Sequence, residues 1–178
     1  MKTFIDYLSK YAAYHRDRRN IATHFVGVPM IVAAVAILLS RPVFAHLDGV
    51  AMTPALLAVV IIGLFYLKLD IRFGIAMAVF LGFCLWLGQY FAALSTMNWL
   101  VAGIGMFVVG WIIQFVGHYY EGKKPAFVDD IMGLAIGPIF VAAELAFELG
   151  LRKDIEDAVV SRVGPTHIRQ MKIGRAHV

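Results

Sequence analysis

The chain has 178 residues, of which 61% are hydrophobic, 13% aromatic and only 16% charged. Soluble domains carry roughly 45 to 50% apolar and about 25% charged residues, so this composition excludes an ordinary soluble globular protein. The net charge of +4 arises from basic residues beside apolar segments, which indicates contacts with anionic lipid and requires no nucleic acid partner. The chain is therefore predicted to be an integral membrane protein.

The first segment, residues 1–20, is predicted to form an N-terminal interfacial helix. Phe4, Tyr7, Tyr11 and Tyr14 recur at the three- and four-residue spacing of one helical face. Aromatic side chains with a polar tip suit the headgroup level of a membrane, so this face is expected to act as an anchor. A cleaved signal peptide within residues 1–45 is the alternative, but the charged leader is long for such a segment.

Four apolar segments follow this leader and predict the fold class. They lie near residues 24–40, 50–67, 72–94 and 98–118, and each approaches the length of about 20 residues that a membrane-spanning helix needs. We therefore expect an all-α, polytopic membrane helix bundle with about four transmembrane helices. The single cysteine, Cys84, lies within an apolar segment, which excludes an intramolecular disulfide and predicts a small buried side chain.

A fifth apolar segment, residues 131–149, has a different character. It contains Gly137-Pro138 together with the carboxylates of Glu144 and Glu148. Carboxylates in hydrocarbon are costly unless they face protein or water, so this helix is expected to be re-entrant, interfacial or packed inside the bundle. Residues 1–150 are predicted to form a single integral membrane domain, followed by a basic cytoplasmic tail over residues 151–178.

The basic residues predict the orientation of the bundle. With four crossings and a cytoplasmic N-terminus, fifteen of the 16 Lys and Arg residues face the cytoplasm, and only Arg41 lies outside. Both termini are therefore expected to be cytoplasmic. The sequence leaves open whether the membrane is a bacterial inner membrane or the endoplasmic reticulum, and it does not indicate an oligomeric state.

Polar side chains gather at the cytoplasmic ends of two predicted spans. His15, Asn20 and His24 lie where the leader meets the first span, and Gln114, His118 and Glu121 share one face at the end of the fourth. Because both groups lie at one membrane surface, the three histidines can assemble a metal site. Neutral imidazole is the commonest metal ligand, and such a set leaves open positions on Fe(II) or Zn(II). The alternative for each histidine is a hydrogen bond to backbone or water.

Other residues have roles that depend on this metal site. Ligating imidazoles usually donate their second nitrogen to an acceptor, a role expected for the side-chain oxygens of Asn20 and Gln114. Gly27 and Gly117 are small residues where helices are expected to approach closely. Glu144 is either functional, as an intramembrane carboxylate is by default, or paired with a basic residue from the leader or residues 121–130.

These residues carry a resemblance to a known family. The run His15-Arg-Asp-Arg-Arg-Asn20-Ile-Ala-Thr-His24-Phe-Val-Gly-Val-Pro29 is followed by Gln114-Phe-Val-Gly-His118-Tyr-Tyr-Glu121 and then by Pro125-Ala126, Gly137-Pro138 and Glu144. Over residues 1 to about 150 this pattern resembles the 2-hydroxy fatty acid dioxygenase family of phytosphingosine metabolism, small membrane proteins formerly known as a domain of unknown function.

The resemblance implies an Fe(II)-dependent α-oxidation in which a 2-hydroxy fatty acid and O2 yield a fatty acid one carbon shorter. It implies a mononuclear metal site, which the same ligands could also form with zinc, held by His15, His24 and His118. Glu121 would be a fourth ligand or a base, and Asn20, Gln114 and Glu144 would assist catalysis. Four basic residues would attract the substrate carboxylate: Arg16, Arg19, Lys123 and Lys124. A small transporter or channel that uses the buried Glu and His, and a non-catalytic membrane scaffold, are the competing interpretations.

Overall fold

The structure is a computed structural model that describes residues 3–170, and within this range helices account for most of the chain. The elements in chain order are α1 (Phe4–Ala12), α2 (Arg18–Ser40), β1 (Ala45–Leu47), β2 (Val50–Met52), α3 (Pro54–Leu69), α4 (Ile71–Ala92), α5 (Thr96–Glu121), the short 3-10 helix η1 (Ala126–Val128), α6 (Met132–Glu148) and α7 (Lys153–Val163). The predicted all-α membrane helix bundle is confirmed.

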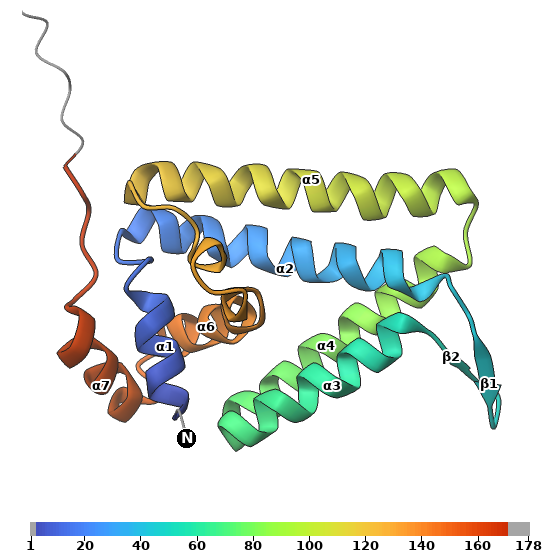
Figure 1. Cartoon of the computed structure of the whole chain (residues 1–178), viewed down its shortest axis with the longest axis horizontal. Helices are drawn as coiled ribbons and strands as arrows, with labels where there is room; N and C mark the ends of the chain where they lie inside the picture. The colour runs from blue at the N-terminus through green and yellow to red at the C-terminus, as the bar shows by residue number, and fades with distance from the viewer. Residues whose placement is uncertain (1–2, 171–178) are drawn as a thin grey trace, which may run out of the picture.

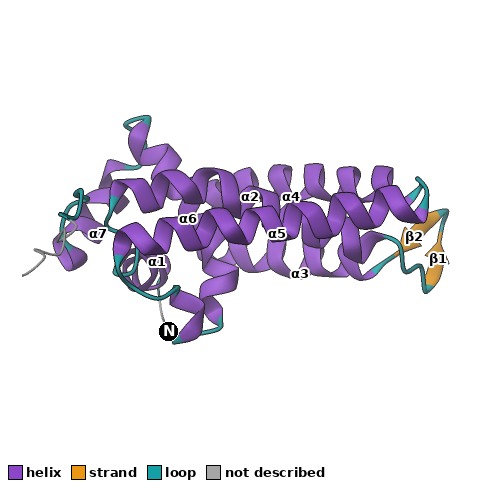
Figure 2. Cartoon of the chain, turned by 90° about the horizontal axis from the view of Figure 1, so that it is seen from above, coloured by secondary structure: helices purple, strands orange, loops and turns teal. Residues whose placement is uncertain are grey.

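The long helices form an elongated body. Figures 1 and 2 show α2 and α5 side by side along the long axis, with the antiparallel pair α3 and α4 beside them and diverging from α2 at one end. The hairpin β1–β2 lies at the opposite end from α1, α6 and α7. The bundle therefore has two distinct ends. One is formed by α1, α6 and α7 and is called the polar end, because buried polar residues such as His15, His24 and Glu121 lie there. The other is the hairpin end.

Each predicted span overlaps one helix, although α2 already begins at Arg18, ahead of the span predicted near residues 24–40. Helices α2, α4 and α5 are long and apolar enough to cross a membrane, whereas α3 is a shorter apolar helix of 16 residues. The prediction of a span over residues 50–67 was wrong at its start, because residues 50–52 are a strand. Asp48 and Gly49 both have positive φ, at 48° and 81°, which is typical of a tight hairpin turn. Thr53 then caps α3 and Pro54 begins it.

The fifth apolar segment packs within the protein. Helix α6 contains Pro138, contacts α1, α2 and α4, and is bent by 110° from α7. Helix α7 covers the first part of the basic segment that follows residue 150. It packs against α1, and its Ile155 and Val159 are buried. The end of that segment, residues 171–178, lies outside the described residues.

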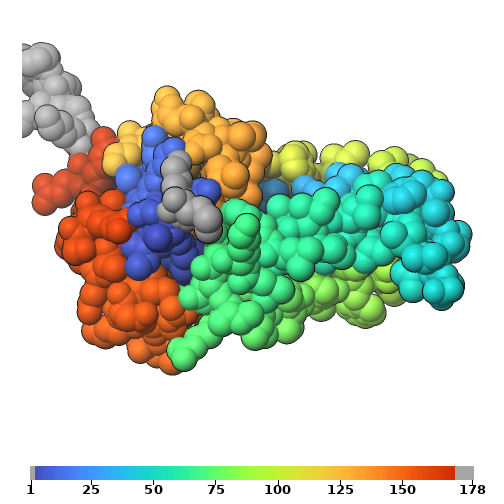
Figure 3. Space-filling view, turned by 60° about the horizontal axis from the view of Figure 1, so that its bottom comes forward, coloured from blue at the N-terminus to red at the C-terminus, as the bar shows by residue number. Residues whose placement is uncertain are grey.

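The aromatic face of α1 is part of the core. Phe4 and Tyr11 are buried, and their rings lie 5.4 Å from Phe73 and 4.8 Å from Phe140, respectively. Figure 3 shows α1 enclosed between α7 and the turn that joins α3 to α4. Half of the aromatic stripe that the sequence suggested as a membrane anchor therefore packs against other helices, and this contact fixes the position of the polar end.

Glycines bring α2 and α5 into close contact, as the sequence predicted. A Cβ atom on Gly27 would lie 2.6 Å from Nε2 of Gln114, and one on Gly117 would lie 2.5 Å from Oδ1 of Asn20. Cys84 is also buried, as expected. Because the two backbones approach so closely, the polar residues at the ends of α2 and α5 face one another.

Gly117→Ala tests this contact. The added methyl group would clash with α2, so we expect the variant to unfold more easily by about 1–3 kcal/mol. Gly105→Ala is the matched control on the same helix, because nothing lies within 4 Å of its Cβ position. Alanine favours a helix over glycine by about 1 kcal/mol, so the control should be slightly more stable than the wild type. Thermal unfolding in detergent measures both, and equal melting temperatures for the two variants would contradict the close approach.

Candidate metal centre

Three helical regions each place one histidine at the polar end of the bundle. His15 lies in the turn between α1 and α2, His24 lies in the second turn of α2, and His118 lies in the last turn of α5. Their exposed fractions are 0%, 2% and 7%. One ring nitrogen from each histidine lies within 4.8 Å of the others. The structure thus brings together the three histidines that the sequence singled out.

The hydrogen bonds of His15 and His24 define which nitrogens are free. Nδ1 of His15 lies 2.8 Å from the carbonyl oxygen of Tyr11, and Nδ1 of His24 lies 2.8 Å from that of Asn20. A carbonyl oxygen can only accept a hydrogen bond, so each Nδ1 carries the proton. In a neutral imidazole the other nitrogen, Nε2, then has a free lone pair. Burial lowers the pKa of His15 well below its ordinary value, which favours this neutral form.

The two free nitrogens face each other. Nε2 of His15 and Nε2 of His24 are 3.0 Å apart, so two lone pairs point into the same small space. Without a cation this arrangement is repulsive. Two nitrogens bound at about 2.0–2.1 Å to one metal ion lie about 3 Å apart when the bonds are at right angles. Buried Nδ1 of His118 has no hydrogen-bond partner among the described residues, which leaves a third free lone pair. The donor set therefore fits a divalent metal ion.

The acceptors of the imidazole protons differ from those predicted. Backbone carbonyl groups take this role for His15 and His24, because an i to i+4 spacing brings each ring over the preceding turn. The side chain of Asn20 instead donates to Oε2 of Glu121 at 3.1 Å, and its buried Oδ1 has no hydrogen-bond partner within residues 3–170. The backbone carbonyl of Asn20 therefore accepts a hydrogen bond from His24, whereas its side chain binds Glu121.

Glu121 holds the turn that carries His15. Its carboxylate accepts hydrogen bonds from the backbone N–H groups of Arg16, at 3.0 and 3.1 Å, and of Asp17, at 2.8 Å, as well as from Asn20. These bonds join the end of α5 to the start of α2. The carboxylate predicted as a ligand or base thus accepts hydrogen bonds from this turn, and the possible metal ligands that lie together in the described part of the chain are the three histidines.

The basic residues predicted to attract a carboxylate are engaged elsewhere. Nη2 of Arg16 lies 3.2 Å from Oε1 of Glu144. The buried carboxylate of Glu144 is thus paired with a basic residue of the leader, which is one of the two alternatives that the sequence left open. Nη1 of Arg16 donates to the carbonyl of Gly164, so this arginine joins three parts of the chain. Three further contacts hold the others: Arg19 with Asp17 at 2.7 Å, Lys123 with the carbonyl of Ala13 at 2.7 Å, and Lys124 with Asp129 at 2.6 Å.

A cavity of about 70 Å³ opens beside the histidines, between α1, α2, α5 and α6. Its polar lining consists of His24, His118, Gln114 and Tyr11, and no Lys, Arg, Asp or Glu is among the described residues that line it. Gln114 is buried, and its Nε2 has no hydrogen-bond partner among residues 3–170. Gln114 thus lines this cavity with a side chain whose amide donor is unused among the described residues and lies beside Gly27 of α2.

Tyr11 was not predicted as part of the site. Its ring is stacked on His15 with a centroid distance of 4.2 Å and an interplanar angle of 4°. Burial raises the pKa of Tyr11, so the hydroxyl stays protonated and able to donate. The spacing of Tyr11 and His15, four residues apart, could have identified it, but the aromatic stripe of α1 suggested a membrane anchor instead.

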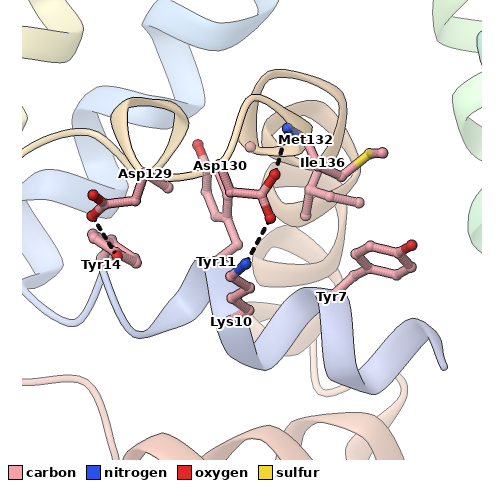
Figure 4. Close-up of a pocket in the computed structure, with 10 residues that line it drawn as sticks. Tyr7, Lys10, Tyr11, Tyr14, Asp129, Asp130, Met132 and Ile136 are labelled. Atoms are coloured by element: carbon pink, nitrogen blue, oxygen red, sulfur yellow. Dashed lines mark hydrogen bonds and ion pairs between the residues drawn. The ribbon is translucent and has the colours of Figure 1, made fainter. Parts of the chain in front are cut away.

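The segment after α5 is fastened to α1 next to the cavity. Figure 4 shows Lys10, in α1, and Tyr14, in the turn that follows it, reaching to Asp130 and Asp129, respectively. The bonded atoms are 2.6 Å and 2.7 Å apart, respectively. Residues 125–127 of this segment line the histidine cavity, so these exposed contacts keep its wall in place.

Comparisons with known proteins identify the family of the chain. Residues 1–149 match the model of the family described as "2-hydroxy-palmitic acid dioxygenase Mpo1-like". The chain is similar to 2-hydroxy-palmitic acid dioxygenase MPO1 of Saccharomyces cerevisiae, with 30% identity over 145 residues that cover 80% of this chain and 79% of the yeast protein. No solved structure matches the chain. The chain belongs to the Mpo1-like family of 2-hydroxy-palmitic acid dioxygenases.

Proposed function

We propose that this protein is an Fe(II)-dependent dioxygenase that shortens 2-hydroxy fatty acids by one carbon. The observation that carries the proposal is the pair of Nε2 atoms of His15 and His24, 3.0 Å apart and accompanied by His118, at the edge of a cavity with a mostly apolar wall. Each of these two imidazoles has its Nδ1 beside a backbone carbonyl oxygen. The family adds the substrate class, because the yeast relative is named as a dioxygenase of a 2-hydroxy fatty acid.

The overall reaction balances with O2 as the only oxidant. A 2-hydroxy acid and one O2 give the shortened acid, CO2 and water, so C2 of the substrate becomes the new carboxyl carbon. The substrate loses four electrons and O2 gains four. When bound, Fe(II) supplies the redox chemistry with O2 and the positive charge that the substrate carboxylate requires. The three histidines would hold it, and the same ligands could hold zinc, which would not support this redox reaction.

The protein's own residues would bind and orient the polar end of the substrate. Because none of the described residues that line the cavity is cationic, the two neutral donors, Gln114 and Tyr11, are left to receive the carboxylate and the 2-hydroxyl group. Glu121 and Asn20 would not contact the substrate. Their hydrogen bonds would instead hold the turn that carries His15 in position.

The distribution of polar residues favours an enzyme over a transporter. Residues 25–39 of α2 are all apolar or glycine and proline, so the polar side chains of this helix do not continue across the bundle. The site lies at the end that carries both described chain ends. We infer that this end faces the cytoplasm, since all described basic residues except Arg41 belong to it or to segments adjoining it.

Product analysis tests the proposal. Protein purified without a histidine tag is stripped of metal, loaded with Fe(II) or Zn(II), and incubated with 2-hydroxypalmitate in air. The iron form should yield pentadecanoate, and substrate labelled with ¹³C at C1 should release labelled CO2. The zinc form should yield neither. Equal product formation by the zinc and iron forms would contradict the redox role of iron. If the iron form gave no product, the proposed dioxygenase activity would be refuted.

Gln114→Leu tests the donor at the cavity wall. A hydrogen bond to a charged group contributes about 1.5–3 kcal/mol, so we expect kcat/KM for 2-hydroxypalmitate to fall by about 10- to 100-fold while bound iron stays unchanged. Gln89→Leu, at an exposed position of α4, is the matched control and should keep full activity. Unchanged kinetics in both variants would show that Gln114 does not contact the substrate.

A further inference from the structure

A second, larger cavity lies deeper in the bundle. It measures about 340 Å³ and lies between α2, α3, α4, α5 and α6. Its lining is apolar except for the thiol of Cys84, the indole of Trp111 and the hydroxyl of Tyr66, which donates to the carbonyl of Ala135 at 2.6 Å. None of the three histidines lines this cavity, and no charged side chain is among the described residues that do. An apolar cavity of this kind fits a hydrocarbon chain.

The two cavities are adjacent. Five residues line both of them, and this shared lining is called the neck below: Ile31, Val32, Trp111, Leu134 and Pro138. Four of these side chains are apolar and the fifth is the indole of Trp111. A ligand that binds the histidine site through a polar head can therefore extend its tail through this neck without meeting a charged group.

The two cavities together are long enough for a long acyl chain. Their lining runs along α2 from His24 to Leu39, fifteen residues further and thus roughly 22 Å away at the helical rise. One leaflet of a bilayer, filled by one layer of lipid acyl chains, is about half of the 30 Å hydrocarbon core. The distance from the histidines to the far end thus exceeds the depth of a leaflet.

The packing of the helices explains where the cavity ends. Helices α3 and α4 diverge from α2 toward the histidine end, as Figure 1 shows, and converge with it toward the hairpin end. At that end α2 and α4 touch, since a Cβ atom on Gly88 would lie 2.8 Å from the carbonyl oxygen of Ala36. Leu39 and Ala55 line the cavity near this contact, and the small side chain of Ala58 lines it one turn of α3 nearer to the neck.

From this geometry we propose that the apolar cavity holds the acyl chain of the substrate and that its far wall, at Leu39 and Ala55, sets the longest chain accepted. The inference rests on the proposed function and deepens it. The carboxylate and 2-hydroxyl group lie at the histidines, and the methyl end lies near the hairpin end of the bundle. Ala58 is the position where a larger side chain shortens the available length.

Chain-length profiles of three variants test the inference. For Ala58→Phe, kcat/KM for 2-hydroxypalmitate relative to a ten-carbon 2-hydroxy acid should fall by about 10-fold or more, since pocket contacts of this size discriminate 10- to 200-fold. Leu39→Ala should shift the profile toward chains longer than that of palmitate. Ala78→Phe makes the same change at an exposed position of α4 and should leave the profile unchanged. Profiles of Ala58→Phe and Leu39→Ala that both equal the wild type would overturn the assignment.

A binding measurement separates this inference from the proposed function. Trp111 lies in the neck, so palmitate brominated in mid-chain should quench the part of the fluorescence that is lost in Trp111→Phe. Ala58→Phe should reduce this quenching and Ala78→Phe should not. If the wild type shows this pattern but shortens no 2-hydroxy acid, the cavity assignment stands and the enzyme proposal fails. If the wild type is active but Trp111 is not quenched, the cavity assignment fails alone.

Discussion

Replacing His118 with alanine is expected to remove bound iron and to lower the rate of pentadecanoate formation by more than about 100-fold, since changes to groups that merely support a metal ligand already cost about 10- to 100-fold. The apo protein should lose little stability, because buried Nδ1 of His118 has no partner among the described residues. Removal of a free lone pair from a cluster of three can even relieve repulsion.

The effect of Fe(II) on the melting temperature shows whether His118 binds the metal or only supports the fold. A metal that binds only the folded state stabilises it by about 2.7 kcal/mol at 100 times its Kd, so Fe(II) should raise the melting temperature of the wild type but not of His118→Ala. His46→Ala is the matched control, because His46 is exposed on β1 at the other end of the bundle. If His118→Ala bound as much iron as the wild type, His118 would not be a metal ligand.

Replacing Glu121 with alanine is expected to have the second large effect, on stability. Three N–H donors would lose their acceptor: the backbone groups of Arg16 and Asp17 and the amide of Asn20. Each unsatisfied buried donor costs about 1–3 kcal/mol, so the loss should be roughly 3 kcal/mol or more. Iron binding should weaken as well, because the turn that carries His15 is released.

Glu121→Gln refines this test. Glutamine keeps one oxygen acceptor, so this variant should be more stable than Glu121→Ala while still binding iron in its folded fraction. Glu148→Gln, at an exposed position of α6, is the control and should unfold like the wild type. If Glu121→Gln kept wild-type stability but lost iron, the carboxylate would be a metal ligand rather than the support described above.

The sequence was sufficient for the features that depend on local pattern. Uninterrupted apolar segments predicted the helices, and His24 and His118 were found because a polar residue at the end of a span is conspicuous. The hairpin β1–β2 was missed although Asp48-Gly49 is a typical turn pair, because the apolar residues on both sides were assigned to spans and loops.

The roles of the charged residues could not be predicted from spacing. Arg16 and Glu144 are 128 positions apart in the sequence and meet only because α1 and α6 pack together. Glu121 shares a helical face with His118, as expected. Its carboxylate, however, accepts a hydrogen bond from the backbone of the turn between α1 and α2, which the spacing of residues within α5 does not reveal. Tyr11 was taken as an anchor because a stripe of aromatic residues does not reveal whether lipid or protein covers it.

We propose that one iron ion, held by His15, His24 and His118, carries out the reaction. The decisive experiment is an anaerobic titration of Fe(II) into metal-free protein without a histidine tag, followed by a single exposure to O2 with 2-hydroxypalmitate. Pentadecanoate formation should rise linearly and saturate at about one iron per chain, as for a mononuclear site. Saturation at two irons per chain, or product formation that is independent of added iron, would contradict it.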